Sequence, residues 1–298
     1  MADVYEGERL NGKDHGVGKM WYTDHRTVYN GAWVLGRKHG TGNIIWESGD
    51  HYEGEWQNDK PHGKGNYTWK SGKMYHGEWK NGVQHGRGKK LSPRGEVEFD
   101  GQWENAKKHG KGKIIFTDGS VYDGEWLNGF QHGRGKKLSP SGEVEYEGKW
   151  ENDKKHGKGK ITFDDDAVYD GEWQNDYRHG KGKQSWTDGD SYEGEWQNHL
   201  FHGKGKYVWS DGSIYKGEWQ NHNMHGKGKL TDTDGSIYDG EWQNNNKHGK
   251  GKNTFSNKDV YDGDYQNDLQ HGQGKKTYSN GTVEYDGQWE NDKRKSNN

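Results

Sequence analysis

Ring-bearing and polar residues alternate along this chain, and the alternation itself repeats. Residues 52–56 read Tyr-Glu-Gly-Glu-Trp, so rings and glycine occupy every second position and acids fill the positions between them. A period of two predicts a β-strand with the rings on one face and the acids on the other. A turn-rich segment follows at 57–61, and residues 62–69 alternate again, with glycines and rings sharing one face. Each unit therefore predicts a β-hairpin.

This unit recurs from one end of the chain to the other. Its first aromatic residue stands at Tyr5, Tyr29, Tyr52, Tyr75, Phe99, Tyr122, Tyr146, Tyr169, Tyr192, Tyr215, Tyr238, Tyr261 and Tyr285. Successive members are 23 or 24 residues apart, and a His-Gly pair separates each from the next. We therefore expect an all-β protein in which residues 1–298 form one elongated array of about twelve and a half antiparallel hairpins, as a solenoid-like, twisted and grooved sheet.

Glycine has a structural role in this pattern. Gly54 and Gly65 fall on the face that carries the rings, where a bare backbone leaves room for a neighbouring ring to lie over it. The rows of Tyr and Trp can then form a core without a second layer. On the opposite face, Glu53 and Glu55 stand beside Lys64, and opposite charges paired across strands predict a solvated, balanced surface.

Composition alone gives a misleading picture. Only 25% of residues are hydrophobic and 31% are charged, as in many disordered chains. The net charge is only −3, however, and the aromatic residues, 13% of the chain, stand in strict register, so we expect an ordered protein. The balanced charge gives no reason to expect nucleic acid as a partner. The N-terminus lacks a basic and then apolar signal region, so we expect a cytoplasmic protein that is not secreted.

The repeating pattern predicts neither a catalytic site nor a metal site. The chain has no cysteine, and equivalent histidines of neighbouring repeats are expected about 10 Å apart, too far to share a zinc ion. The carboxylates all belong to the repeat, and the Gly-Lys-Gly-Lys runs lie in predicted strands rather than in phosphate loops. We expect no enzymatic activity, no cofactor and no metal. One local alternative is an adventitious site formed by His199, His202, His222 and His225.

The full motif is Tyr-x-Gly-x-Trp-x-Asn-(Gly/Asp)-x-x-His-Gly-x-Gly, as in residues 122–135. This motif resembles the MORN repeat, and the resemblance covers nearly the whole chain. It implies an elongated all-β array with a scaffolding or tethering role, often at cytoskeletal, ciliary or membrane-associated structures. Some relatives carry a fused catalytic domain, for which this chain has no room. Arg9 and Tyr265 stand where the motif usually has Trp, as expected for capping repeats.

The first hypothesis for function is a scaffold that holds an extended or helical segment of a partner protein in an aromatic groove or at a sheet edge. The groove residues expected to contact the partner are Tyr52, Trp56, Trp69, Tyr75, Trp79, Tyr122, Trp126, Tyr169, Trp173, Trp186, Tyr192, Trp196, Trp209, Tyr215 and Trp219. The alternative is a peripheral module that binds phosphoinositides or other anionic lipids, for which no unbalanced polybasic surface is evident.

The repeats also differ in ways that bear on binding. Ser92 and Ser139 stand where other repeats have a ring, and each of these two repeats gains one residue after its turn glycine. This indicates either a recent duplication with a harmless bulge or a groove that is locally wider. Apolar residues are expected to be exposed at loops, where they would mark a partner strip, at Phe130, Tyr177, Leu200, Phe201, Met224 and Leu269.

The ends of a strand meander leave open edges. The last strand presents Tyr285, Gly287 and Trp289, and the sequence predicts no full hairpin beyond it. We therefore expect a homodimer through this C-terminal edge, since a two-fold contact uses one patch twice.

Overall fold

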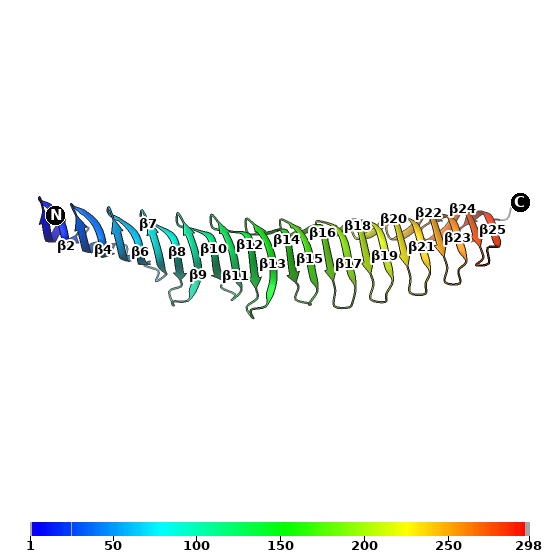
Figure 1. The fold of residues 1–298 in the computed structure, drawn as a ribbon, viewed down its shortest axis with the longest axis horizontal. Helices are drawn as coiled ribbons and strands as arrows, with labels where there is room; N and C mark the ends of the chain where they lie inside the picture. The colour runs from blue at the N-terminus through cyan, green and yellow to red at the C-terminus, as the bar shows by residue number, and fades with distance from the viewer. Residues whose placement is uncertain (1, 25, 296–298) are drawn as a thin grey trace. The chain divides into compact units, whose positions relative to one another are not determined.

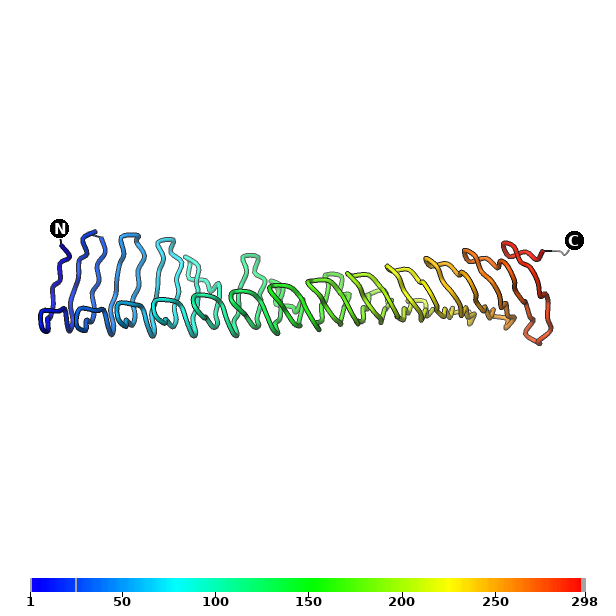
Figure 2. The backbone as a smooth tube through the Cα atoms, turned by 90° about the horizontal axis from the view of Figure 1, so that it is seen from above, coloured from blue at the N-terminus to red at the C-terminus, as the bar shows by residue number. Residues whose placement is uncertain are grey.

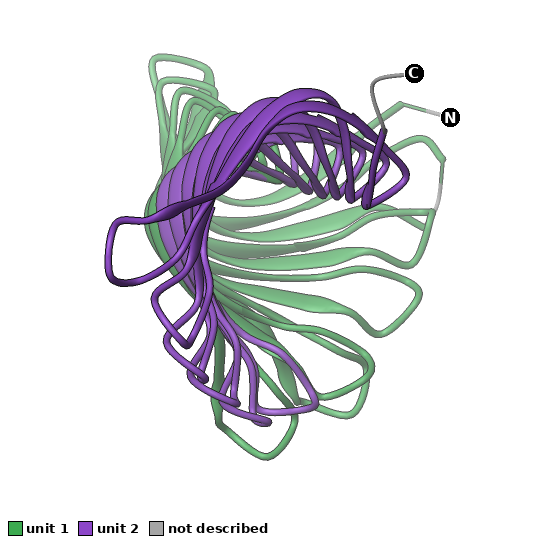
Figure 3. Cartoon of the chain, turned by 90° about the vertical axis from the view of Figure 1, so that its right-hand side faces the viewer, with its two compact units in different colours: residues 1–154 green, residues 155–298 purple. Residues whose placement is uncertain are grey.

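The computed structural model describes residues 2–24 and 26–295, and every regular element in them is a β-strand (Figure 1). The predicted all-β fold class is thus confirmed. The chain divides into two compact units, residues 1–154 and 155–298 (Figure 3). Whether the two continue as one array stays a prediction, and each unit is described by itself below.

Unit 1 holds the first thirteen strands. They are β1 (Val4–Leu10), β2 (Lys13–Trp21), β3 (Val28–Val34), β4 (Arg37–Ile45), β5 (His51–Gln57), β6 (Lys60–Thr68), β7 (Met74–Lys80), β8 (Val83–Leu91), β9 (Val97–Glu104), β10 (Lys107–Ile115), β11 (Val121–Leu127), β12 (Phe130–Leu138) and β13 (Val144–Glu151). Each pairs antiparallel with the next, so the unit is a meander of hairpins.

Unit 2 repeats this architecture. Its strands are β14 (Lys154–Thr162), β15 (Val168–Gln174), β16 (Tyr177–Ser185), β17 (Ser191–Gln197), β18 (Leu200–Val208), β19 (Ile214–Gln220), β20 (Asn223–Thr231), β21 (Ile237–Gln243), β22 (Asn246–Thr254), β23 (Val260–Gln266), β24 (Leu269–Thr277), β25 (Val283–Glu290) and β26 (Lys293–Arg294). Within either unit, successive hairpins lie side by side (Figure 2). Since all the regular elements described are strands, the structure offers no helix that could span a bilayer.

Two kinds of turn connect the strands. Inside a hairpin, β5 and β6 are joined by Asn58 and Asp59, whose φ values of 50° and 68° fit a two-residue turn of the I′ type. Asn and Asp tolerate this left-handed region better than most residues do. Between hairpins, the Gly72 N–H donates to the Trp69 carbonyl oxygen at 2.8 Å, and Gly72 itself has a φ of +83°.

A register shift inside each hairpin corrects the simple alternation expected for residues 62–69. Gly54 pairs with Gly65 but Glu55 pairs with His62, so two residues of β6 bulge out. Gly63 takes a φ of +56°, and the Lys64 N–H donates to Glu55 Oε1 at 2.9 Å. In this repeat the acid before the Trp therefore holds the bulge in place, and Gln102 does the same for the Lys111 N–H at 3.0 Å, a role that the alternation did not reveal.

The core is made of the Tyr and Trp rows, as the sequence predicts. From Tyr29 to Tyr261 the first ring of each repeat is no more than 1% exposed, and the second ring, from Trp33 to Trp289, is between 2% and 7% exposed. Tyr52 shows how this is possible in one sheet. Its ring lies so close over the backbone that a Cβ at Gly65 would come within 2.3 Å of its hydroxyl oxygen. Burial of these rings supplies the main apolar stabilisation of each unit.

Edge-to-face contacts and hydrogen bonds lock the rows together. The Tyr52 ring meets Trp56 at 5.2 Å and Trp79 of the next repeat at 5.3 Å, both nearly perpendicular. The Tyr52 hydroxyl donates to the Glu55 carbonyl oxygen at 2.8 Å, and Trp56 Nε1–H donates to the Gly42 carbonyl oxygen at 3.0 Å. Tyr52 is thus tied to its own repeat and the following one, and Trp56 to its own repeat and the preceding one.

The inserted residue of the serine-containing repeats is a bulge in the strand after the turn. Lys90 pairs with Phe99 and Leu91 pairs with Val97, so Glu98 has no partner across the strand. Glu98 instead forms an ion pair with Lys73 at 3.2 Å. The expected harmless bulge is therefore present, and it carries a charged side chain.

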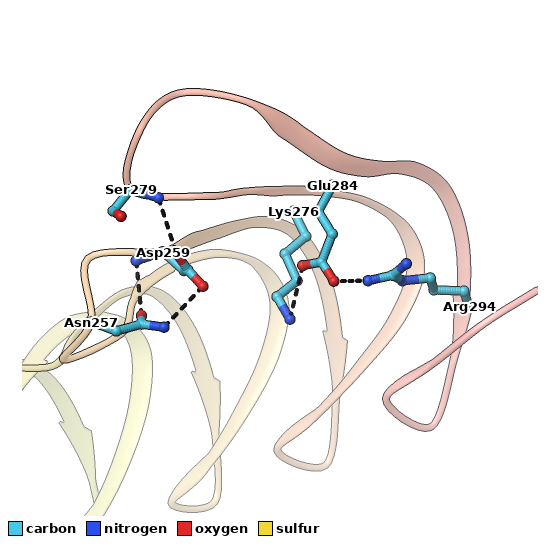
Figure 4. Close-up of polar contacts among 6 residues, drawn as sticks. All are labelled: Asn257, Asp259, Lys276, Ser279, Glu284 and Arg294. Atoms are coloured by element: carbon cyan, nitrogen blue, oxygen red, sulfur yellow. Dashed lines mark hydrogen bonds and ion pairs between the residues drawn. The ribbon is translucent and has the colours of Figure 1, made fainter.

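The C-terminal edge carries one short strand beyond β25. Strand β26 pairs with the end of β25, with Trp289 opposite Arg294, so Trp289 is buried rather than open. Glu284 lies between Lys276 and Arg294 and forms ion pairs with both (Figure 4). Tyr285 stays partly exposed and donates its hydroxyl proton to the Lys295 carbonyl oxygen at 2.9 Å. No full hairpin was expected beyond this strand, and the structure adds only the two-residue strand β26, whose pairing covers the end of β25. The dimer itself stays a prediction that light scattering of the full chain can test.

Candidate partner-binding face

Each strand has two chemically different faces. The ladder face carries the Glu, Asp and Lys residues of the repeat, and its charges pair across strands as predicted. Lys89 contacts Asp100 at 3.0 Å and Lys136 contacts Glu147 at 3.1 Å, in each case across to the next repeat. These pairs are exposed, so each stabilises the fold by only about 0–1 kcal/mol. The face is a neutralised, solvated surface.

The ring face carries the Tyr, Gly and Trp of the repeat, and the structure divides the expected groove residues into two groups. Twelve of them are buried in the core, namely Tyr52, Trp56, Tyr75, Trp79, Tyr122, Trp126, Tyr169, Trp173, Tyr192, Trp196, Tyr215 and Trp219. Only Trp69, Trp186 and Trp209 are partly exposed. A buried side chain offers no surface to a partner, so the twelve act as core and only the three partly exposed residues remain as candidates for partner contact.

Three further positions on the ring face vary between repeats, and sequence reasoning passed over two of them. The first is opposite the Trp of the repeat, as Pro61 is opposite Trp56. The second is opposite the Tyr, as Tyr67 is opposite Tyr52. The third is two residues later, as Trp69 is. The signal that marks these positions is their variation within a unit whose other positions hardly change.

In unit 1, the variable positions assemble an aromatic cluster of Trp46, Tyr67 and Trp69. The Tyr67 ring lies 5.5 Å from Trp46 and 4.8 Å from Trp69. Its hydroxyl donates to Asp50 Oδ2 at 3.1 Å, which fixes the ring, and burial together with this bond raises the pKa of Tyr67 to about 12. The Lys70 N–H donates to Asp50 Oδ1 at 2.8 Å and holds the pKa of that carboxyl below its usual value.

In unit 2, a second aromatic cluster has the same construction, with Trp186, Tyr207, Trp209 and Phe201. Tyr207 lies 5.9 Å from Trp186 and 4.8 Å from Trp209, and its hydroxyl bonds to Asp190. Phe201 stacks on the buried ring of Tyr192 at a centroid distance of 3.9 Å and is only 7% exposed. The expectation that Phe201 is an exposed loop residue was wrong, because its position faces the rings.

Other apolar residues do lie at the surface. Phe130 and Tyr177 are 50% and 49% exposed, each at the start of the second strand of its hairpin, and Leu269 is 37% exposed at the equivalent place. Leu200 and Met224 are only partly exposed. These residues belong to different repeats, and a partner strip along them stays a prediction.

In several repeats the first variable position is a Lys or Arg whose charged group lies over an aromatic ring. Lys108 Nζ lies 4.4 Å from the Trp126 ring centroid, and the Arg178 guanidinium lies 4.5 Å from that of Trp196. Burial is the main cause that lowers the pKa of both cations. Such cation–π contacts contribute about 0.5–2 kcal/mol each, more when the cation is desolvated. The ring face therefore carries cations as well as aromatic rings, which the sequence reading missed.

Two of the four histidines singled out in the sequence, His199 and His222, have local structural partners. His199 Nδ1 accepts the Arg178 N–H at 3.2 Å and His222 Nδ1 accepts the Phe201 N–H at 3.4 Å, just as Asp59 Oδ1 accepts the backbone N–H of the preceding repeat elsewhere. His202 and His225 instead line a hollow beside the ladder face. The proposed group of four is thus divided between two surfaces. Among the described residues, no three His, Asp or Glu side chains are placed to hold a metal ion.

The MORN-repeat family profile matches residues 5–25, 29–51, 52–74, 75–97, 99–121, 122–144, 146–168, 169–191, 192–214, 215–237, 238–260, 261–283 and 285–295. The chain belongs to the MORN-repeat family. These thirteen segments span nearly all of it, and repeats of this kind indicate a scaffold that binds proteins or membranes. No curated protein sequence matches the chain significantly.

Several solved structures share a weak likeness with this MORN-repeat chain. One is the TCP domain of Drosophila melanogaster SAS-4 in complex with a proline-rich motif of Ana2, with 12% identity over 58% of this chain and 88% of that one, and a TM-score of 0.30. Another is the TCP10 domain of Danio rerio CPAP in complex with a STIL peptide, with 12% identity over 85% and 98%, and a TM-score of 0.28. The CPAP G-box domain gives 14% identity over 66% and 90%, with a TM-score of 0.31. Similarity at this level supports no inference about function.

Proposed function

We propose that this MORN-repeat chain is a non-enzymatic scaffold that binds segments of partner proteins on its ring face. The observation that carries the proposal is the pair of aromatic clusters, one in each unit. Each gathers partly exposed Trp and Tyr rings at or just past the ends of strands whose repeat-motif rings are buried. Exposed Trp and Tyr held in fixed positions are the residues that usually carry interface energy.

The ring face is a better candidate than a sheet edge. Within each unit, every inner strand is paired on both sides, so a partner strand could join only at a terminal strand such as β1. The clusters, in contrast, need no strand to be displaced. Asp50 and Asp190 hold the Tyr hydroxyls in position before a partner arrives, which reduces the ordering cost of binding.

Cellular placement follows from the family rather than from the geometry. We propose a cytoplasmic protein associated with cytoskeletal, ciliary or membrane-associated structures. An anionic-lipid module remains the second candidate function, because cations lie on the ring face. The ladder face gives it no support, since its charges are neutralised by pairing.

Selection of binders from a random-peptide display library on the immobilised chain tests the proposal. Peptides selected in this way should bind the chain carrying Trp69→Ala and Trp209→Ala at least about tenfold more weakly, since loss of two anchors costs more than 1.4 kcal/mol. The matched control replaces the exposed rings Phe130 and Tyr177 with Ala and should bind as the parent does. Failure to select any peptide, or equal loss in both variants, would overturn the proposal. Salt-sensitive pelleting with phosphatidylserine vesicles, in the absence of peptide binding, would favour the lipid module.

A further inference from the structure

Two lysines on the ring face of unit 1 lie next to the aromatic cluster. Lys90, on β8, is opposite Tyr75 on one side and Phe99 on the other, and its Nζ lies 5.9 Å from the Trp69 ring centroid. Lys108, on β10, lies with its Nζ 5.5 Å from the Phe99 centroid. Both lysines therefore lie beside Phe99, Lys90 as its partner across the strands and Lys108 with its ammonium over the ring, and the Lys90 ammonium lies near Trp69 of the cluster.

Neither lysine has an anionic partner within the part of the chain that the structure describes. Among the described residues, no carboxylate oxygen lies within 4.0 Å of either Nζ, and the bulged acid Glu98 pairs with Lys73. Burial lowers the pKa of Lys108, and the neighbouring charge of Lys90 lowers it further, against weaker opposing effects of Asp153 and Glu98. A partly desolvated cation without a counter-ion is stabilised when an anion binds beside it.

The side chains around Lys90 leave this charge accessible. Ser92 occupies the third variable position, where the preceding repeat has Trp69. Its hydroxyl is engaged within its own loop, where it accepts the Glu96 N–H at 3.2 Å. Small size and an internal hydrogen bond mean that Ser92 neither covers Lys90 nor competes for an anion.

The contrast with the ladder face identifies what binds here. Lys89, the residue before Lys90, points to the ladder face and pairs with Asp100 at 3.0 Å. The same short segment thus neutralises the lysine of one face and leaves the lysine of the other without a carboxylate. Charge complementarity on the ring face must then come from a bound molecule.

We propose that the ring face of unit 1 recognises an acidic, extended segment of a partner protein. An apolar or aromatic side chain of the segment packs on Trp46, Tyr67 and Trp69, and a carboxylate meets Lys90 and Lys108. This proposal rests on the proposed function and adds the chemistry of the partner. Tyr67 and Lys90 lie two strands apart, about 10 Å, which an extended chain covers in about three residues. The expected pattern is therefore an apolar anchor with Asp or Glu about three residues away.

The test uses the library-selected peptides of the preceding section and two double variants of the full chain. One is Lys90→Gln with Lys108→Gln. Its matched control is Lys111→Gln with Lys113→Gln, which removes two exposed lysines of the same strand β10 that are opposite acids on the ladder face. Both variants are first checked for unchanged melting and circular dichroism, and Lys90→Arg serves as a charge-conserving version.

Peptides selected on the parent chain should carry the acid at the expected spacing. Changing that acid to Asn or Gln should weaken binding about tenfold, since a charge-assisted contact contributes roughly 1.5–3 kcal/mol. The ring-face variant should lose the same factor and stop distinguishing acidic from neutral peptides. The ladder-face control and Lys90→Arg should keep the preference.

Each other outcome overturns the proposal and shows what fails. Selection of peptides that lack acids and still need Trp69 for binding would support the scaffold function and contradict the acidic partner. Equal losses in the ring-face and ladder-face variants would indicate non-specific attraction. Phosphatidylserine vesicles that depend on Lys90 and Lys108, with peptides indifferent to both, would make the occupant a lipid. Absence of any selected peptide would remove the proposed function itself.

Discussion

Two neighbouring stretches of unit 1, the aromatic cluster and the lysine pair, share the pairing of their hairpins but differ in chemistry and in the bulge at Glu98 that follows the second. In both, the central glycines are opposite each other, Gly54 with Gly65 and Gly77 with Gly88, and a two-residue turn closes the hairpin. In both, the first ring of the repeat is fully buried. They differ at the second and third variable positions, which are Tyr67 and Trp69 in one stretch and Lys90 and Ser92 in the other. The fixed residues thus hold the fold, and the variable residues give each stretch its own surface chemistry, on which we base the proposed binding.

The two stretches also differ in how firmly neighbouring repeats are joined. At the cluster, Asp59 accepts the Lys38 N–H at 2.9 Å from the preceding repeat. In the next turn, Gly82 takes the place of that acid, and the residue it faces, Pro61, has no N–H to donate. Only the backbone bond from Gly82 N–H to the Pro61 carbonyl oxygen, at 2.9 Å, remains. The contact between repeats that precedes the lysine pair therefore has fewer hydrogen bonds than the contact that precedes the aromatic cluster.

The largest expected effect is the difference in the free energy of unfolding between replacing a fixed Trp and replacing a variable one. Trp126→Ala removes a side chain that is 4% exposed, together with its 2.8 Å hydrogen bond to the Gly112 carbonyl oxygen. We expect a loss of about 3–5 kcal/mol in the free energy of unfolding, which disrupts the repeats on both sides. Trp69→Ala, at a partly exposed position, should lose only about 1 kcal/mol. Urea unfolding and hydrogen exchange around residue 126 measure the difference, and unchanged exchange there would refute the account.

Transfer of the aromatic pair onto the lysine stretch tests the comparison between the two stretches more finely. Lys90→Tyr with Ser92→Trp should turn the lysine stretch into a second aromatic cluster and remove its preference for acidic peptides. Because the fixed rings and glycines are untouched, the free energy of unfolding should change by no more than about 1.5 kcal/mol. The measurements are peptide binding by fluorescence anisotropy and thermal melting.

The control for that exchange is Lys89→Tyr with Lys111→Tyr, which places two rings on the ladder face. It should leave the acid preference intact. A collapse of the fold in the exchanged protein, with a native control, would mean that the variable positions also support the sheet and would end the separation between fold and binding.

The sequence was sufficient for the fold because the repeat restates the same local pattern many times. The Tyr-Gly-Trp alternation predicts the strands, and Gly54 and Gly65 predict that a ring covers bare backbone. Exposure could not be predicted in the same way. Trp56 and Trp69 are identical residues in one repeat, and only the register shift at Gly63 and the strand end at Thr68 make one buried and the other accessible.

The candidate site was predicted only in part for a related reason. Alternation assigns residues to a face, but the neighbour of each side chain depends on pairing with the adjacent strand. Lys108 lies over Trp126 of the following hairpin, so its desolvation is invisible within its own repeat. Glu98, at its bulge, pairs with Lys73 and not with Lys90, whereas the equivalent Glu145 pairs with Lys137. The positive and negative charges nearly cancel when they are counted along the sequence. Only the structure shows that charges pair on the ladder face and that the ring face carries lysines without such a partner in the part of the chain that it describes.

The smallest expected effect is a pH dependence that the aromatic cluster has and the lysine stretch lacks. Hydrogen bonds from the Lys70 N–H and the Tyr67 hydroxyl hold the pKa of Asp50 below its usual value. A carboxyl with a lowered folded pKa stabilises the fold above its unfolded pKa, and the contribution is lost as pH falls through the folded value. Acidification from about pH 5 to about pH 3 should therefore loosen the Tyr67 ring and the Lys70 amide. The lysine stretch has Lys73 at the position of Asp50, so its amides should show no such transition. Amide shifts of Lys70 followed by NMR measure the effect, with Asp50→Asn as the control that abolishes it. A Lys70 transition at or above the usual aspartate pKa, or one that persists in Asp50→Asn, would show that this carboxylate does not hold the cluster.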